Sequence, residues 1–296
     1  MRCFFVSKNS RISQKNGNRG TQGTGKYGPN SSGQHLICSK RLVRRMIQLA
    51  ETKPHSLVLD IGAGTGAITM PLAQEGLRVL AIENDPAFAE KLRKKCGEAD
   101  HIRIIENDVL KCTLPREPFV VVSNIPFSIT TPILGKLMDQ PAMPFQRAVL
   151  IVEYGAARRF TADPITNPRI LGWRMWFDIT FVQTVSSVHF SPPPRVNAAI
   201  LLISRKSRPP VAIGEHRRFM GLALHALRSP YMPVREALSG IFTVPQITRL
   251  TRNLGIDRNE PICSLNETQW TLTYDAMRHY VDPHRWPRVP KAGWTT

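Results

Sequence analysis

The residues that could do chemistry stand out where an apolar run ends in Asn124-Ile125-Pro126-Phe127. The run at 119–123 is typical of a buried strand, so the four residues should form a turn at its carboxyl end. The Asn124 side-chain carbonyl and the Ile125 backbone carbonyl could accept hydrogen bonds from both protons of an exocyclic amine such as adenine N6. Pro126 would fix the backbone, and Phe127 could stack on the base. The alternative is an ordinary turn that caps a strand.

A glycine-rich segment follows an earlier apolar run. Residues 57–66 read Leu-Val-Leu-Asp-Ile-Gly-Ala-Gly-Thr-Gly. Glycines permit a sharp turn and the close approach of a ligand to the backbone, and Gly62, Gly64 and Ala67 satisfy the G-x-G-x-x-A fingerprint. The segment therefore predicts an adenine-containing cofactor. By itself it cannot separate a nicotinamide from S-adenosylmethionine, or either from a turn that only needs glycine.

Two acidic residues follow the next apolar runs. Glu83 ends the run at 78–82, and Asp108 follows the run at 102–105. Ligands of doubly wound sheets bind at the carboxyl ends of the strands. Glu83 could accept hydrogen bonds from ribose hydroxyls, and Asp108 could accept one from an adenine amino group. Each acid alone could be a surface residue, but their order along the chain favours a shared site.

The elements that must position these residues alternate between strand and helix patterns. We expect a helix through residues 42–50 with Ser39 as its N-cap, and a loop at 190–195, where three prolines exclude a central strand. The alternation predicts an α/β, Rossmann-like fold whose parallel sheet is covered on both faces. Strands are expected at 56–60, 78–82, 102–105, 119–123, 148–153, 178–188 and 197–204, and helices near 66–75, 86–96, 131–138, 154–160, 215–227 and 267–280.

Composition divides the chain into three parts. Residues 1–32 are polar and basic, so we expect a flexible arm there. Residues 33–205 should form the catalytic domain, and residues 206–296, after a Lys-Ser-Arg-Pro-Pro linker signal, a basic helical RNA-binding domain. The net charge is +18, yet residues 51–203 hold 16 basic and 15 acidic residues, whereas residues 1–50 hold 10 basic and none acidic. Basic flanks around a near-neutral body indicate a nucleic-acid partner.

Other features exclude several classes of protein. No apolar run is long enough to span a membrane, and the apolar part of the first six residues is too short for a secretory signal. The five cysteines are scattered without a C-x-x-C pair, and the histidines show no metal spacing. We therefore expect a cytoplasmic protein with reduced cysteines, no bound metal and no membrane partner. We also expect a monomer.

With Gly33-Gln34-His35-Leu36, the glycine segment, Glu83, Asp108 and Asn124–Phe127 together, the chain resembles the ribosomal RNA adenine dimethylases, and within them the erythromycin-resistance (Erm) methyltransferases. The likeness runs from about residue 32 onward and includes Val152–Arg159, Phe190–Val196 and Gly240–Thr243. It implies transfer of methyl groups from S-adenosylmethionine to N6 of one adenine in 23S rRNA before the ribosome is fully assembled. Resistance to macrolides, lincosamides and streptogramin B would follow.

The resemblance also implies roles for particular residues. The catalytic group would be Asn124, Ile125, Pro126 and Phe127, and Phe127 stands where many relatives have Tyr, which keeps the stacking ring. The cofactor would be held by His35, Ile37, Gly62, Gly64, Glu83, Asp108 and Asn124.

Further candidates have two interpretations each. Arg158, Arg159 and Arg195 could contact RNA or belong to a solvated surface, and Trp173 and Trp176 could pack in the core or stack on bases. The alternative functions are a small-subunit rRNA adenine dimethyltransferase and a non-catalytic nucleic-acid-binding relative. A nicotinamide dehydrogenase explains neither the basic flanks nor Asn124–Phe127.

Overall fold

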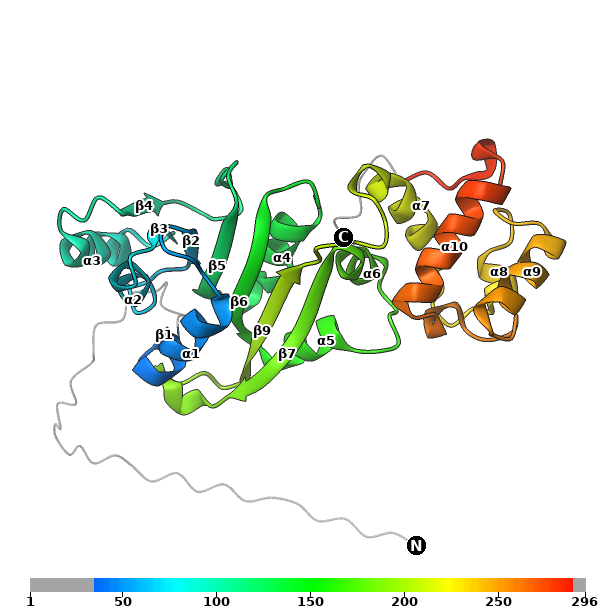
Figure 1. The fold of residues 1–296 in the computed structure, drawn as a ribbon. Helices are drawn as coiled ribbons and strands as arrows, with labels where there is room; N and C mark the ends of the chain where they lie inside the picture. Colours follow the sequence, from blue (N-terminus) through cyan, green and yellow to red (C-terminus); the bar gives the residue numbers. More distant parts are fainter. Residues whose placement is uncertain (1–34, 290–296) are drawn as a thin grey trace, which may run out of the picture. The chain divides into compact units, whose positions relative to one another are not determined.

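A computed structural model describes residues 35–289, and its centre is a seven-stranded mixed sheet in the order β4-β3-β2-β5-β6-β9-β7 (Figure 1). The expected arm, residues 1–32, and the final residues 290–296 lie outside the described part. The strands of this sheet are β2 (Leu57–Ile61), β3 (Arg78–Glu83), β4 (Ile102–Glu106), β5 (Phe119–Asn124), β6 (Phe145–Glu153), β7 (Phe177–Val185) and β9 (Ala198–Arg205).

Five neighbouring strands, β4, β3, β2, β5 and β6, run parallel, as the alternating pattern predicts. The predicted parallel arrangement ends at β6, and the sheet is mixed at that edge, because β9 runs antiparallel to both β6 and β7. The physical reason lies in the connection. A parallel pair needs a long crossover, usually a helix, whereas residues 186–197 between β7 and β9 hold no α-helix.

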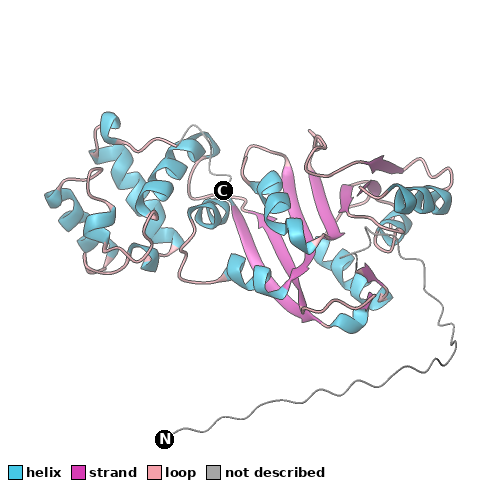
Figure 2. Cartoon of the chain, turned by 180° about the vertical axis from the view of Figure 1, so that it is seen from behind, coloured by secondary structure: helices cyan, strands magenta, loops and turns pink. Residues whose placement is uncertain are grey.

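Successive apolar side chains along the central strands point to opposite faces of the sheet, so both faces are buried. One face packs against α1 (Lys40–Ala50), α2 (Thr69–Gln74) and α3 (Pro86–Cys96) through residues such as Met46, Leu72 and Leu92. The other face packs against α4 (Thr130–Met138) and α5 (Tyr154–Thr161), and the two helical layers lie on either side of the strands in Figure 2. Ser39 is the N-cap of α1, as predicted, since its Oγ accepts a hydrogen bond from the Leu42 N–H.

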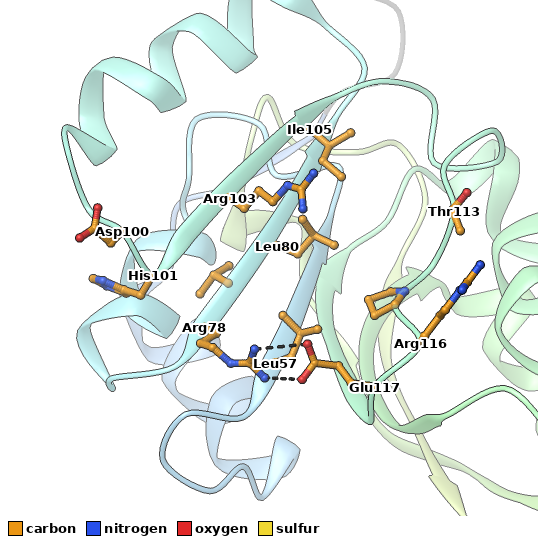
Figure 3. Close-up of a pocket in the computed structure, with 12 residues that line it drawn as sticks. Leu57, Arg78, Leu80, Asp100, His101, Arg103, Ile105, Thr113, Arg116 and Glu117 are labelled. Atoms are coloured by element: carbon orange, nitrogen blue, oxygen red, sulfur yellow. Dashed lines mark hydrogen bonds and ion pairs between the residues drawn. The ribbon is translucent and has the colours of Figure 1, made fainter.

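Full cover of the second face is not reached, because residues 107–118 between β4 and β5 form no helix. A hollow of about 690 Å³ remains over the first residues of β2 and β3 (Figure 3). Leu57 and Leu80 form part of its floor, and Arg78 and Glu117 join across it through two hydrogen bonds of 3.2 and 2.6 Å.

A second, two-stranded sheet ties the first described residues to the triple-proline segment. In it, β1 (Leu36–Ile37) pairs antiparallel with β8 (Phe190–Ser191). His35 extends the contact, because its Nδ1 lies 2.9 Å from the Pro192 carbonyl oxygen, and the Cys38 N–H donates to His189 O. The expectation of a loop at 190–195 is wrong for Phe190 and Ser191, whose backbone pairs with β1, and it is confirmed for the prolines at 192–194, which lie beyond the strand.

After β9 the chain is helical, with α7 (His216–Ala226), α8 (Val234–Ala237), α9 (Val244–Leu254) and α10 (Glu267–Tyr280). One apolar cluster continues from the sheet through α6 (Pro168–Trp176) into these helices. The division of the chain at residue 205 stays a prediction. Among residues 35–289, no helix combines the length and apolar character that a membrane crossing requires.

Trp173 and Trp176 lie on α6 and pack in the core, being 2 % and 1 % exposed, which confirms the packing interpretation over base stacking. The Trp176 ring meets Phe219 of α7 edge to face, with ring centroids 5.8 Å apart, and its Nε1 donates to Val211 O. Beside this contact, Glu267 at the start of α10 accepts hydrogen bonds from Arg174 (2.7 Å) and Lys206 (2.8 Å). The helical part is thereby joined to the sheet.

Candidate active site

The predicted residues meet at the carboxyl ends of four neighbouring strands. The glycine segment follows β2, Glu83 ends β3, Asp108 lies two residues beyond β4, and Asn124 ends β5. The chain leaves β2 for β3 on one side and later adds β5 on the other side of β2. Such a point of reversal is where open α/β sheets bind ligands, because the crossovers diverge there and leave a crevice.

The glycine segment needs glycine for its backbone. Gly62, Gly64 and Gly66 have φ values of +72°, +54° and +84°, a left-handed region that other residues adopt at a cost. Gly62 also lies against the turn after β5, since a Cβ there would be 3.4 Å from Pro126 Cδ. At Gly64 a Cβ would approach Leu36 Cδ2 to 2.9 Å. The loop therefore carries no side chain where β1 and the Asn124–Phe127 turn close on it.

Glu83 is 5 % exposed and both of its carboxylate oxygens already hold the loop in place. Oε2 accepts a 2.7 Å hydrogen bond from the Gly64 N–H, and Oε1 accepts one of 2.9 Å from the Asp85 N–H. Each oxygen retains a second lone pair. Glu83 can thus fix the glycine loop and still accept hydrogen bonds from the two hydroxyls of a ribose.

Asp108 lies half-buried in the turn after β4. Its Oδ1 accepts a hydrogen bond from the Leu110 N–H at 2.9 Å, which leaves Oδ2 with no partner among the described residues. The Asn107 N–H donates to Glu83 O, so the backbone next to Asp108 is held against the end of β3. This placement suits the predicted acceptance of an adenine amino group, and that role stays a prediction.

Asn124 is the most constrained side chain of the site. Its Nδ2 donates a 2.7 Å hydrogen bond to His35 O, and this bond fixes the amide, because the reverse orientation would set two oxygens against each other. Its Oδ1 is buried and has no hydrogen-bond partner within residues 35–289. A buried acceptor without a partner is costly to a fold, so it marks a position that a ligand donor can satisfy.

The three residues after Asn124 differ in exposure. Ile125 is 1 % exposed, and its side chain anchors the turn in the core. Pro126, at φ −59°, is exposed, and its carbonyl accepts the Ile129 N–H. Phe127 is half-buried, with its ring centroid 6.5 Å from that of His35. The Ile125 carbonyl accepts no hydrogen bond from the described part of the chain. It can therefore serve as the second acceptor for an amine.

His35 and Ile37 enter the site in different ways. His35 contributes its backbone carbonyl to Asn124, while its ring is held by Pro192. The Ile37 side chain is buried with Leu42 and Val43 of α1, so any contact with a cofactor would come from its backbone. Cofactor binding by these two residues stays a prediction.

The three arginines proposed for RNA are all exposed. The Nη2 of Arg159 donates to Thr131 Oγ1 at 3.3 Å, which places this guanidinium beside the helix that follows Phe127. Arg158 lies over the Phe181 ring at 5.9 Å. The Arg195 side chain makes no hydrogen bond or ion pair within residues 35–289. It lies three residues after Pro192, whose carbonyl contacts the His35 ring.

Sequence reasoning assigned no role to two residues of the site. Leu36 closes against Gly64, and only the pairing of β1 with β8 brings it there. Asp60 is 1 % exposed, and its Oδ2 accepts a 2.7 Å hydrogen bond from Thr69 Oγ1 while Oδ1 has no partner in the described residues. Burial, with the charge of Glu83, raises the pKa of Asp60 to about 7. An acidic residue in the middle of an apolar run was the available signal.

The sheet order and the Asn-x-Pro-aromatic turn after β5 are those of a Rossmann-like methyltransferase. The fold agrees with a crystal structure of the 23S rRNA methyltransferase ErmE, at a TM-score of 0.73 and 22 % identity, over 82 % of this chain and all of that one. The profile of the family described as ribosomal RNA adenine dimethylase matches residues 28–278. The chain belongs to this family.

Two relatives span nearly the whole chain. An rRNA adenine N-6-methyltransferase of Bacillus licheniformis is 43 % identical over 284 residues, which cover 96 % of this chain and 97 % of the relative. One of Bacillus anthracis is 42 % identical, with the same coverage of both chains. The similarity therefore includes the helical part as well as the sheet.

Proposed function

We propose that the protein methylates N6 of one adenine in 23S rRNA, and that this modification gives resistance to macrolides, lincosamides and streptogramin B. Family membership makes the chain an rRNA adenine N-6-methyltransferase that uses S-adenosylmethionine. The choice of 23S rRNA, action before ribosome assembly, a cytoplasmic location and a monomeric state are the further parts of the proposal. The resemblance to the Erm branch supports them.

The observation that carries the chemistry is the unpartnered Asn124 Oδ1. It is held in one orientation by His35 O and follows the strand next to the glycine loop. An adenine amino group has two protons to donate. Asn124 Oδ1 and Ile125 O are two acceptors without partners in the described part of the chain. A reacting nitrogen would be positioned by these two bonds.

The residues of the crevice also fit the cofactor. Glu83 would accept from the ribose hydroxyls, Asp108 from the adenine amino group, and the side-chain-free backbone of Gly62 and Gly64 would leave room for the rest. When bound, S-adenosylmethionine supplies an electrophilic methyl group on a positively charged sulfur.

The role of Asn124 is to favour the reacting form of the target amine. The N6 lone pair is delocalised into the adenine ring and is a poor nucleophile. Hydrogen bonds from both amine protons to Asn124 and Ile125 favour the tetrahedral nitrogen, whose lone pair is free to react. The half-buried ring of Phe127 gives the base a face on which to stack. The nitrogen becomes acidic once it carries the new methyl group, so water can take the released proton and no side-chain base is required.

A base inside a helix cannot reach this site, so the target adenine must be unpaired or flipped out. Exposed loops of RNA meet this requirement most readily. The basic residues of the chain supply the affinity for phosphate, and Arg159, close to Thr131 on α4, would lie at the edge of the pocket that receives the base.

The experiment that tests the proposal compares two RNA substrates. Methyl transfer from labelled S-adenosylmethionine is measured on protein-free 23S rRNA and on immature small-subunit particles, and the labelled nucleoside is identified. We expect N6-methylated adenine in 23S rRNA, and counting one or two methyl groups completes the description. Label only in the small-subunit particle would assign the chain to the small-subunit branch instead, and label in neither would support a non-catalytic binder.

A further inference from the structure

We propose that the exposed face of α1, formed by Lys40, Arg41, Arg44 and Arg45, binds the phosphate backbone of the RNA next to the target adenine. The inference rests on the proposed function, because it assumes an RNA substrate. All four side chains are exposed. They are followed by no acidic residue before Glu51, so α1 carries a charge of +4 within six residues.

These four side chains have no partners among the described residues. Within residues 35–289, none of them takes part in an ion pair or a side-chain hydrogen bond. Helix α3, which also carries four basic residues, differs. There Arg93 pairs with Glu106 at 2.8 Å, Lys94 pairs with Glu90 at 2.6 Å, and the Lys95 Nζ donates to Thr65 O. The cations of α1 are thus not used to stabilise the fold.

Their positions in the helix oppose stability. Lys40 and Arg41 lie in the first turn, where the helix dipole already places positive charge. Lys40 and Arg44, and likewise Arg41 and Arg45, are four residues apart, so like charges lie one turn above each other. The arrangement is unfavourable in the free protein and becomes favourable when a polyanion covers it.

The helix is a firm support for such contacts. Its opposite face, Leu42, Val43, Met46 and Ala50, is buried against the sheet. Its N-cap Ser39 follows β1 after one residue. Leu36 of β1 lies against the glycine loop, and His35, just before β1, accepts the hydrogen bond from Asn124. A strand of RNA on this face would therefore pass close to the reacting centre.

A groove runs beside α1 to the last residues of the glycine segment. A hollow of about 900 Å³ lies between α1 and α2, and its walls include Cys38, Lys40 and Arg44 on one side and Gly66, Ala67 and Met70 on the other. Lys95 adds a cation at the glycine loop, whereas Glu51 and Glu75 lie on the stretches that follow α1 and α2. The charge is thus positive toward the catalytic end and negative toward the far end. This polarity matches a chain of phosphates that leaves the active site along the start of α1.

The test uses Arg44→Gln/Arg45→Gln and measures affinity for a protein-free 23S rRNA fragment over a series of KCl concentrations. The association constant falls as salt rises, and each contact to a single-strand phosphate adds about 0.7 to the steepness of log K against log salt. The loss of two contacts should therefore make the dependence less steep by about 1.4 and raise the KM for RNA. Arg44→Lys/Arg45→Lys keeps the charge and should retain the slope. The Kd for S-adenosylmethionine should stay at the wild-type value in both.

The matched control is Lys91→Gln/Lys94→Gln, which removes the same charge from the exposed face of α3. It should retain the wild-type slope and rate. Three results would overturn the inference. The glutamine variant of α1 could keep the wild-type salt dependence, or the α3 control or the lysine variant of α1 could lose as much salt dependence as the glutamine variant. Wild-type methyl transfer separates the two proposals. If the wild type transfers no methyl group but the α1 variants still change RNA affinity, the proposed function is wrong and the RNA-binding role of α1 is supported. If it succeeds without an α1 effect, the inference alone falls.

Discussion

The side-chain amide of Asn124 donates a 2.7 Å hydrogen bond to the backbone carbonyl of His35, 89 residues earlier in the chain. The bond joins the turn after β5 to the segment that enters β1, and it leaves Asn124 Oδ1 buried without a partner among residues 35–289. His35 is itself held by Pro192 beyond β8. Three distant segments therefore cooperate to aim one acceptor, and this pre-organisation is what a transfer to a weakly nucleophilic amine requires.

The glycine loop offers a test with a built-in control. Gly64→Ala places a Cβ 2.9 Å from Leu36 Cδ2 at φ +54°, while Gly76→Ala adds a Cβ at φ +74° with no atom within 4 Å. Both should lose about 1–2 kcal/mol of unfolding free energy through backbone strain. Only Gly64→Ala should weaken S-adenosylmethionine binding, measured by calorimetry. Equal affinities in the two variants would show that the close approach of Leu36 has no part in the site.

Phe127 separates stacking from hydrogen bonding. Phe127→Tyr keeps the aromatic face, and Phe127→Ala removes it, so we expect kcat/KM for RNA to fall about 10- to 100-fold in the alanine variant, in line with about 1–3 kcal/mol per stacked base. The tyrosine variant should stay near the wild type. Steady-state methylation of 23S rRNA measures both, and losses of the same size would argue against stacking.

Asp60 should make the stability of the cofactor-free protein depend on pH. Burial raises its pKa from 3.8 to about 7, so the native state keeps a proton that the unfolded chain has lost between these values. The contribution is destabilising and grows as pH rises toward 7. Asp60→Asn cannot titrate, so from pH 5 to pH 8 the wild type should lose about 2–3 kcal/mol relative to the variant. Urea unfolding across this range measures the difference, and a constant difference would contradict the protonated carboxyl.

Glu267 should matter more to stability than an exposed acid does. It pairs with Arg174 and Lys206, whose side chains are only 18 % and 16 % exposed. Glu267→Gln removes the less exposed carboxylate of each cation, because Asp163 and Asp178 remain as exposed partners. We expect a loss of about 1–3 kcal/mol, between the values for exposed and fully buried pairs. Glu90→Gln, which breaks the exposed pair with Lys94, should cost under about 1 kcal/mol. Thermal unfolding compares them, and equal losses would mean that the junction is not held by Glu267.

The sequence was sufficient for the elements with strong local patterns. Alternating strands, the glycine turn and the Ser39 cap follow from periodicity and turn chemistry, and the structure confirms them within a few residues. Helix α6 was missed because it is buried on almost all sides, so it has no amphipathic period. Helix α9 was also missed, although its sequence contains a capping box between Thr243 and Gln246 that indicates a helix start.

The parts of the site that could not be foreseen depend on long-range contacts. β1 and β8 have two residues each, too few for any periodicity, and only their pairing brings Leu36 to the glycine loop. The partner of Asn124 is a backbone carbonyl, which any residue type could supply at position 35. The antiparallel direction of β9 likewise depends on the connection it follows and not on its own apolar run.

The most direct test of the central claim identifies the modified atom and its dependence on Asn124. Protein-free 23S rRNA is reacted with labelled S-adenosylmethionine and either the wild type or Asn124→Ala, and the nucleosides are separated and weighed by mass spectrometry. We predict N6-methylated adenosine from the wild type, and at least a 100-fold loss from the variant, with the Kd of the cofactor within a few-fold of the wild type. Methylation of another atom by the wild type, or wild-type turnover in the variant, would contradict the account.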